Sequence, residues 1–153
     1  MSIINKVFID SSALIEYFKG SKLDLLDNLA DMPDCSLVIN EAVVSEVVYH
    51  IIGYMADVSP VTLKRKERIA QILTEIRLES FFRNFEIVNN PTDIQKLLIL
   101  MQTGNYLPND ALILNCCIQN NIRFLATYDA DFRHSFISLR NPSALLSTGL
   151  RKN

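Results

Sequence analysis

The sequence predicts an α/β fold built around a parallel β-sheet, and three observations support that prediction. Short apolar runs of strand length alternate along the chain with longer segments of helical periodicity. The runs lie at 7–9, 35–39, 86–88 and 123–127, and a short fifth one lies at 136–139. Their β-branched and aromatic residues are typical of strands buried on both faces of a sheet. The first and fourth runs lead into acidic residues, at the strand ends that face the ligand crevice in open α/β sheets.

Length and composition are those of a single domain. The chain has 153 residues, of which 49% are hydrophobic, so residues 1–153 are expected to bury one core. No apolar stretch approaches the roughly 20 residues that a membrane-spanning helix needs. The first six residues lack the basic region and apolar run of a secretory signal. We therefore expect a cytoplasmic protein with no membrane association.

Cysteines and net charge restrict the function classes further. The three cysteines are Cys35, Cys116 and Cys117, which lack metal-ligand spacing and are expected to behave as small buried hydrophobes. The net charge of -2 and the pI near 5.6 are not the basic footprint of most nucleic-acid-binding domains. The net charge of the whole chain is misleading if the acids are gathered in a metal site, because bound divalent cations reverse the sign of the local charge that a phosphate backbone meets.

The first acidic residue follows the first apolar run directly. The run 7–9 ends in Asp10 and Ser11, and a helix is expected to begin near Ser12. Aspartate and serine are ordinary N-cap residues, so helix capping by itself explains Asp10. A functional role for Asp10 therefore requires partners elsewhere in the chain.

A glutamate stands in unusual surroundings on the next helix. Asn40 is expected to cap a helix with a broad apolar surface, and Glu46 falls in the middle of that surface. An unpaired buried charge is costly, so Glu46 is either turned to the helix edge or held in a pocket with a partner. The two arrangements remain open on the sequence.

Two further helices are predicted in the middle of the chain. The first spans 60–79 and begins with a basic run that either follows a phosphate backbone or forms a solvated face. That run consists of Lys64, Arg65, Lys66 and Arg68. The second helix is expected to begin at Asn90 and Pro91 and to stop at Gly104. Three phenylalanines between the helices are expected to fill the core. They are Phe81, Phe82 and Phe85.

More aspartates follow in the last third of the chain. Asn109 is a natural N-cap, which would put Asp110 at the first helical position, beside the partial positive charge of the helix terminus. The run 123–127 then leads to Asp129 and Asp131, as the first run leads to Asp10. Each of these acidic residues, Glu46 included, has a structural explanation by itself. If all of them were only structural, their occurrence together in one chain would be a coincidence.

Four short motifs occur in this order along the chain. They are Phe8–Ser12, Ile39–Val47, Pro108–Ala111 and Ala126–Phe132. In order and spacing they resemble the acidic motifs of PIN-domain ribonucleases, a group that includes the VapC-type toxins of prokaryotic toxin–antitoxin pairs. The resemblance covers nearly the whole chain. It implies a three-layer α/β/α fold with a central parallel sheet, and one PIN-like domain over residues 1–153.

The resemblance also implies a set of site residues and partners. Four carboxylates would be catalytic and would bind Mg²⁺ or Mn²⁺, namely Asp10, Glu46, Asp110 and Asp129. Asp131 would be an accessory metal ligand, and Ser11 or Thr127 a neighbouring hydroxyl that orients the acids. The implied partners are an RNA substrate, an antitoxin protein and a second copy of the chain. A surplus of apolar residues on the helices at 41–55 and 92–101 also favours a homodimer.

The chemistry of phosphodiester hydrolysis fits this acid-rich composition. The reaction needs a water nucleophile and stabilisation of charge on the attacking and leaving oxygens, which two hard cations roughly 3.5 to 4 Å apart can share. Mg²⁺ and Mn²⁺ prefer oxygen ligands, and carboxylates gathered without a cation would repel one another. The chain has two histidines, His50 and His134, and neither is a compelling general base.

Alternatives from other classes remain open. A phosphatase or phospho-receiver also places an aspartate after a strand, but Ser12 stands where a haloacid-dehalogenase-like pattern has its second aspartate. A receiver would also need a lysine after a late strand, and 123–131 contains none. The other alternative is a non-catalytic PIN-like scaffold that binds RNA or a protein partner, with its acids capping helices.

Overall fold

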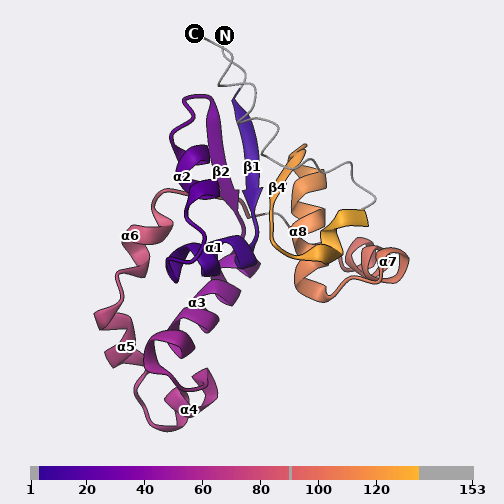
Figure 1. Cartoon of the computed structure of the whole chain (residues 1–153). Coiled ribbons are helices and arrows are strands. Elements are labelled where there is room, and N and C mark those ends of the chain that lie inside the picture. Colours follow the sequence, from indigo (N-terminus) through magenta and orange to yellow (C-terminus); the bar gives the residue numbers. More distant parts are fainter. Residues whose placement is uncertain (1–3, 90, 135–153) are drawn as a thin grey trace.

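A four-stranded, all-parallel β-sheet forms the centre of the fold (Figure 1). The structure is a computed structural model and describes residues 4–89 and 91–134. The strands are β1 (Asn5–Ile9), β2 (Cys35–Ile39), β3 (Glu86–Ile87) and β4 (Phe124–Ala126), and their order in the sheet is β3-β2-β1-β4. The first four predicted strands are therefore confirmed. The fifth, expected at 136–139, lies outside the described residues.

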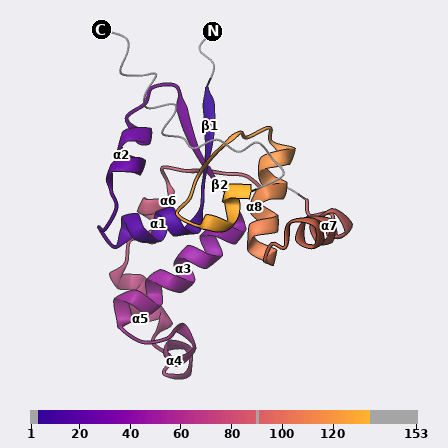
Figure 2. The same cartoon turned by 45° about the vertical axis from the view of Figure 1, so that its right-hand side comes forward.

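Helices cover both faces of the sheet, and the three-layer α/β/α arrangement is confirmed. They are α1 (Ser11–Phe18), α2 (Asp24–Ala30), α3 (Glu41–Ala56), α4 (Pro60–Arg65), α5 (Ile69–Glu75), α6 (Leu78–Phe82), α7 (Ile94–Gly104) and α8 (Pro108–Gln119), followed by a 3₁₀ helix at Ala130–His134. Figures 1 and 2 show α1 to α6 on one side and α7 and α8 on the other. None of the helices within 4–89 and 91–134 has the length and apolar content to cross a membrane.

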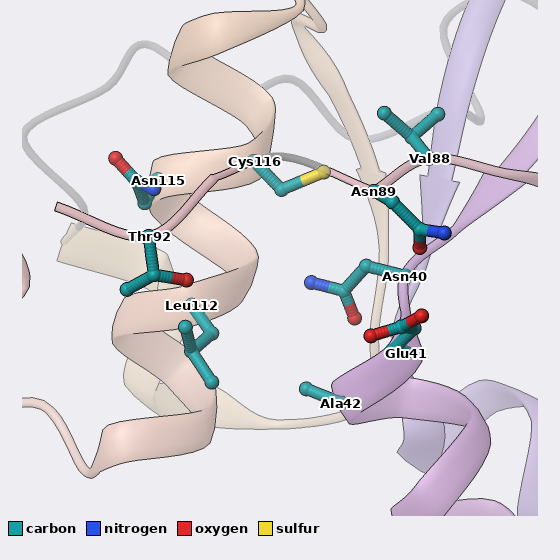
Figure 3. Close-up of a pocket in the computed structure, with 9 residues that line it drawn as sticks. All are labelled: Asn40, Glu41, Ala42, Val88, Asn89, Thr92, Leu112, Asn115 and Cys116. Atoms are coloured by element: carbon teal, nitrogen blue, oxygen red, sulfur yellow. The ribbon is translucent and has the colours of Figure 1, made fainter.

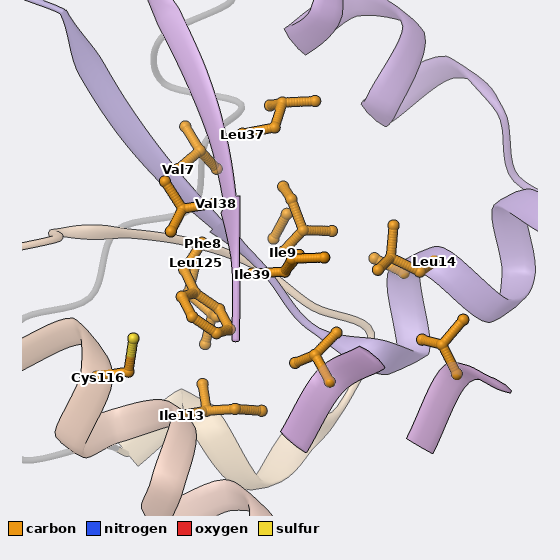
Figure 4. Close-up of a cluster of buried hydrophobic side chains, with 14 of the residues drawn as sticks. Val7, Phe8, Ile9, Leu14, Leu37, Val38, Ile39, Ile113, Cys116 and Leu125 are labelled. Atoms are coloured by element: carbon orange, nitrogen blue, oxygen red, sulfur yellow. The ribbon is translucent and has the colours of Figure 1, made fainter. Parts of the chain in front are cut away.

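The core is built on the two central strands (Figure 4). Val7, Phe8 and Ile9 of β1 are each 0% exposed, as are Val38 and Ile39 of β2. Successive side chains of a strand point to opposite faces, so complete burial of three in a row requires cover on both faces. Complete burial of one such side chain is worth about 1.5–3 kcal/mol. These strands therefore fix the position of whatever follows their carboxyl ends.

The single helix predicted at 60–79 is wrong, because the segment folds into α4, α5 and α6. Glu67 has a left-handed backbone with φ of 53°, and the Arg68 N–H donates to the carbonyl oxygen of Leu63 over 3.0 Å, which closes α4. A second break follows at Ile76, whose backbone is extended. The breaks let Leu63 and Ile76 both enter the core, so tertiary packing overrides helical periodicity. The basic run lies exposed on α4 and on the turn after it.

The predicted start of the helix at 90–104 is also wrong. The α7 helix begins at Ile94, and the Asp93 carboxylate caps it by accepting hydrogen bonds from the N–H groups of Gln95 and Lys96. The predicted end at Gly104 is confirmed. A Cβ at Gly104 would lie 1.9 Å from the ring of Tyr106, so glycine is required there for close packing.

The three phenylalanines pack against the core and two of the three cysteines are buried, as predicted, whereas Cys35 is only half-buried. The Phe81 ring packs within 6 Å, centroid to centroid, of the rings of Phe18, Phe82 and Phe85. Cys116 and Cys117 are buried, and burial raises the pKa of the Cys116 thiol to about 11. These two thiols therefore stay protonated near neutral pH and act as small apolar groups, as predicted.

Candidate active site

Two neighbouring strands end at the same edge of the sheet and carry the acidic motifs there. Ile9 of β1 pairs with Ala126 of β4, and the Asp10 N–H donates to the Ala126 carbonyl oxygen over 3.0 Å. The residues that follow both strands, Asp10 and Thr127, therefore lie side by side. In Figure 2 the segment after β4 passes between α1 and α8.

Asp10 is the most deeply buried of the acids, with 3% of its surface exposed. It occupies the N-cap position of α1, but its side chain accepts no capping hydrogen bond. Its Oδ2 atom instead accepts hydrogen bonds from the hydroxyls of Ser12 at 2.6 Å and Thr127 at 2.7 Å. Helix capping therefore does not explain the Asp10 carboxylate, which is held in place from two different strand ends.

The close hydroxyl partners of Asp10 are Ser12 and Thr127, whereas Ser11 or Thr127 was predicted. The Ser11 hydroxyl lies 3.4 Å from Asp10 Oδ1, at the limit of a hydrogen bond, whereas Thr127 is correctly named. The sequence could have indicated Ser12 as a partner of Asp10, because a residue two positions after an N-cap aspartate lies in the first turn of the same helix. Ser12 also accepts a hydrogen bond from the Tyr128 N–H over 3.0 Å.

Three more carboxylates meet beside Asp10. One oxygen from each of Asp110, Asp129 and Asp131 lies within 4.8 Å of the others. The segment after β4 is held by local hydrogen bonds. The Asp129 N–H donates to the Thr127 hydroxyl over 2.9 Å, and the Asp131 N–H donates to Asp129 Oδ1 over 2.8 Å. The structure thus brings Asp110 together with two acids that lie 19 and 21 positions later in the sequence.

Asp110 reaches this group from the first turn of α8, but not from the position predicted. The N-cap of α8 is Leu107, Pro108 is the first helical residue and Asp110 is the third. Pro108 explains why the helix begins earlier than predicted, since a proline lacks an N–H and has the backbone angle that suits the first helical position. Asn109 is therefore inside the helix, and it does not act as the cap.

The Asp110 carboxyl is electrostatically unusual. Its pKa is raised to about 6, mainly by burial and then by the negative charges of Asp129, Asp10 and Asp131, in that order. A hydrogen bond from the backbone of Leu107 acts in the opposite direction. The group therefore carries mutual repulsion that a bound cation would relieve.

Glu46 lies at the edge of this site and not within the group of three. It is half-buried on α3, and its Oε2 accepts a hydrogen bond from the Asn109 side-chain amide over 3.1 Å. The structure therefore places Glu46 at the helix edge with a partner on α8, next in sequence to Asp110. Asn109 was predicted as a helix cap and not as a partner of Glu46. Glu46 also lines a hollow of about 620 Å³ together with the exposed His50.

A smaller hollow of about 150 Å³ lies between the start of α3, the segment after β3 and α8 (Figure 3). The amides of Asn40, Asn89 and Asn115 line it, and Asn40 and Asn115 are buried. Asn40 has a structural task, because its side chain accepts the N-cap hydrogen bond from the Val43 N–H over 3.0 Å. As predicted, Asn40 caps α3.

The donor set of the acidic group fits a hard divalent cation. The three clustered ligand groups are all carboxylates, and Mg²⁺ and Mn²⁺ take oxygen ligands. Asp110 is half-buried and Asp131 is exposed, so the group is accessible from solvent. The fold and this site together define a class of protein: a three-layer α/β/α domain with an acidic centre at the carboxyl ends of its central strands.

Comparison with known proteins identifies the family within that class. The sequence profile described as PIN domain matches residues 7–135, so the chain belongs to the PIN domain family. It is 28% identical over 132 residues to Ribonuclease VapC2 of Methanocaldococcus jannaschii, covering 84% of this chain and 88% of that protein. The crystal structure of PAE2754 from Pyrobaculum aerophilum superposes with a TM-score of 0.63 at 15% identity. That superposition covers 94% of this chain and 96% of the other, and it shows a shared fold.

Proposed function

We propose that this protein is a metal-dependent ribonuclease that hydrolyses RNA phosphodiester bonds. The observation that carries the proposal is the convergence of Asp110, Asp129 and Asp131 within 4.8 Å, beside the buried Asp10. Such a group is costly to the fold when it holds no cation, as the raised pKa of Asp110 indicates. Family membership and the relative named Ribonuclease VapC2 support the assignment of RNA as the substrate.

In this proposal Asp110, Asp129 and Asp131 hold Mg²⁺ or Mn²⁺ together with Asp10, and Glu46 completes the set from the edge. When bound, the cation supplies a water nucleophile at neutral pH and neutralises the charge that develops around phosphorus. Catalytic roles are assigned to the four acids implied by the family motifs. These are Asp10, Glu46, Asp110 and Asp129.

The remaining residues of the site keep the acids in position. Ser12 and Thr127 both donate to Asp10 Oδ2, so Oδ1 is the oxygen of Asp10 more open to another ligand. The Asn109 amide fixes Glu46 from the helix that carries Asp110. Rigid placement of this kind matters because a ligand set that is preorganised does not lose side-chain entropy when the site is filled.

The biological setting is part of the same proposal. The likeness to VapC2 favours a toxin of a toxin–antitoxin pair, with an antitoxin protein as its partner, acting in the cytoplasm on RNA. We also propose that residues 1–153 form a single PIN-like domain and that two copies pair as a homodimer. Exposed apolar residues support the dimer, since α7 contains no fully buried residue and Ile94 is 70% exposed.

An RNA cleavage assay tests the central claim. The purified, nuclease-free protein is dialysed against chelator and then given Mg²⁺, Mn²⁺ or Ca²⁺ with a labelled RNA. We expect no cleavage with chelator and restored cleavage with Mg²⁺ or Mn²⁺. Ca²⁺ is expected to bind without supporting cleavage, because its longer bonds and looser geometry suit the reaction poorly. Full cleavage by the chelator-dialysed protein would refute the mechanism.

A further inference from the structure

A tyrosine stands between two residues of the acidic site and faces outward from it. Tyr128 follows Thr127 and precedes Asp129, and it is 40% exposed. Its N–H donates to the hydroxyl of Ser12, which in turn donates to Asp10. The backbone of Tyr128 is therefore fixed relative to the carboxylates, while its ring remains accessible from solvent.

A lysine from a different part of the chain lies over this ring. The ammonium of Lys22, in the connection between α1 and α2, is 4.0 Å from the centroid of the Tyr128 ring. This distance is well within the range of a cation–π interaction. The two side chains line a hollow of about 500 Å³. Its other lining residues are Gly20, Ser21, Leu23, Asp24 and Leu25.

The two groups that line the hollow match the two parts of a nucleotide. An aromatic face stacks on any nucleobase, whatever its sequence, and a lysine ammonium pairs with a phosphate. Lys22 is the one cation among the residues that line the hollow, and the lining also includes the carboxylate of Asp24. Without Lys22, a phosphate in the hollow would face the Asp24 carboxylate with no cation among the lining residues.

We propose that the hollow lined by Lys22 and Tyr128 is a subsite for one unpaired nucleotide that flanks the phosphodiester cleaved at the acidic site. The base takes the place of the Lys22 ammonium on the Tyr128 ring, and the displaced ammonium pairs with that nucleotide's phosphate. The subsite rests on the proposed ribonuclease function, since it positions the strand for that reaction. Only an unpaired nucleotide fits, because a base must leave its neighbours in order to stack on a side chain.

A second tyrosine provides a matched control. Tyr54 is 54% exposed and has Lys19 over its ring, with the ammonium 5.4 Å from the centroid. It has the same chemistry as Tyr128 but lies near the end of α3, two turns beyond Glu46. If an exposed tyrosine under a lysine were sufficient to bind the nucleotide, substitution of Tyr54 and of Tyr128 would have the same effect on cleavage. If proximity to the acids matters, only Tyr128 will affect the reaction.

The test combines protein variants with modified RNA. A short single-stranded RNA that the parent protein cleaves is prepared with an abasic nucleotide at each position in turn. Cleavage is then measured for the parent, Tyr128→Leu, Tyr128→Phe, Lys22→Met and the control Tyr54→Leu. Thermal melts with and without Mg²⁺ report separately on whether each variant keeps an intact acidic site.

We expect one position at which the abasic nucleotide lowers kcat/KM of the parent about tenfold, as loss of one base stack should. Tyr128→Leu should raise KM about tenfold with kcat little changed, and it should become insensitive to the abasic nucleotide at that position. Tyr54→Leu should match the parent, and Tyr128→Phe, which keeps the aromatic face, should retain the sensitivity to the abasic nucleotide that Tyr128→Leu loses. Lys22→Met should raise KM and reduce the salt dependence of binding by a slope of about 0.7, the share of one phosphate contact.

Two results would overturn the subsite while leaving the proposed function in place. One is an abasic profile of Tyr128→Leu identical to that of the parent. The other is a Tyr128→Leu variant that has lost its Mg²⁺-dependent rise in melting temperature, which would show that the residue only positions Asp129. By contrast, a parent protein that neither binds nor cleaves RNA would overturn the proposed function and the subsite together.

Discussion

The Thr127 hydroxyl donates a hydrogen bond of 2.7 Å to Oδ2 of Asp10, and so joins the ends of two neighbouring strands, β4 and β1. The same hydroxyl oxygen accepts a hydrogen bond from the Asp129 N–H over 2.9 Å. One side chain thus positions an acid from each of two motifs that are 119 positions apart in the sequence. The acidic site therefore depends on a residue that need not bind a metal itself.

Replacement of Thr127 by valine tests this link. The variant keeps the volume of the side chain but leaves Asp10, which is 3% exposed, with one donor fewer. Loss of a hydrogen bond to a charged group costs about 1.5–3 kcal/mol, and we expect cleavage to fall at least tenfold. Urea denaturation and initial cleavage rates measure the two effects. Thr127→Ser keeps the hydroxyl and should stay near the parent in stability and in cleavage rate. Equal losses in the valine and serine variants would contradict a positioning role for the hydroxyl.

Asp110→Asn removes one charge from the acidic group at nearly constant size. Without metal, the variant should be more stable than the parent by up to about 1 kcal/mol at pH 7, because less like charge is gathered and solvent screens part of the effect. The rise in melting temperature that Mg²⁺ gives the parent should shrink, and cleavage should nearly vanish. Asp31→Asn, on an exposed residue after α2, is the control and should change none of these. If Asp110→Asn kept full cleavage and the full Mg²⁺-dependent rise in melting temperature, the role of Asp110 would be only structural, in the first turn of α8.

The raised pKa of Asp110 predicts how the stability of the metal-free protein depends on pH. The folded-state pKa is about 6 and the ordinary value is 3.8, so between these values the folded state binds more protons than the unfolded state. The contribution of Asp110 to the free energy of unfolding therefore falls as pH rises from about 4 to 6, and stays low above that. Urea denaturation of the parent and Asp110→Asn in chelator should show a difference that grows over this range. A difference that does not vary with pH would argue against the raised pKa.

The proposed homodimer predicts a specific effect of charge on α7. Ile94 is 70% exposed and Leu98 is 49% exposed, so replacement of either by lysine should leave the fold intact and prevent association. Multi-angle light scattering over a range of concentrations measures the mass. Leu73→Lys, at a residue of α5 that is 42% exposed, is the control and should still pair. A parent protein that remains monomeric at high concentration would refute the dimer.

Residues that follow a buried strand were the most accurately predicted part of the site. The run 7–9 is apolar throughout, so its burial and the position of Asp10 after it follow from local sequence. The predictions failed where packing against residues distant in the sequence determines the backbone conformation. The segment 60–79 has helical periodicity, yet Glu67 adopts a left-handed backbone because α4 and α5 each turn an apolar residue into the core. Asp110 lies two helical positions later than predicted, because Pro108, and not Asp110, is the first residue of α8.

The sequence by itself determined the four described strands and their order along the chain, since apolar periodicity and strand length depend on local residue types. Only the tertiary structure decided which acids meet. Parallel pairing of β1 with β4 brings Asp10 beside Thr127, and α8 carries Asp110 to Asp129 and Asp131, while Glu46 is held at the edge by Asn109. The raised pKa of Asp110 is likewise tertiary, because burial and the charges of acids distant in sequence cause it.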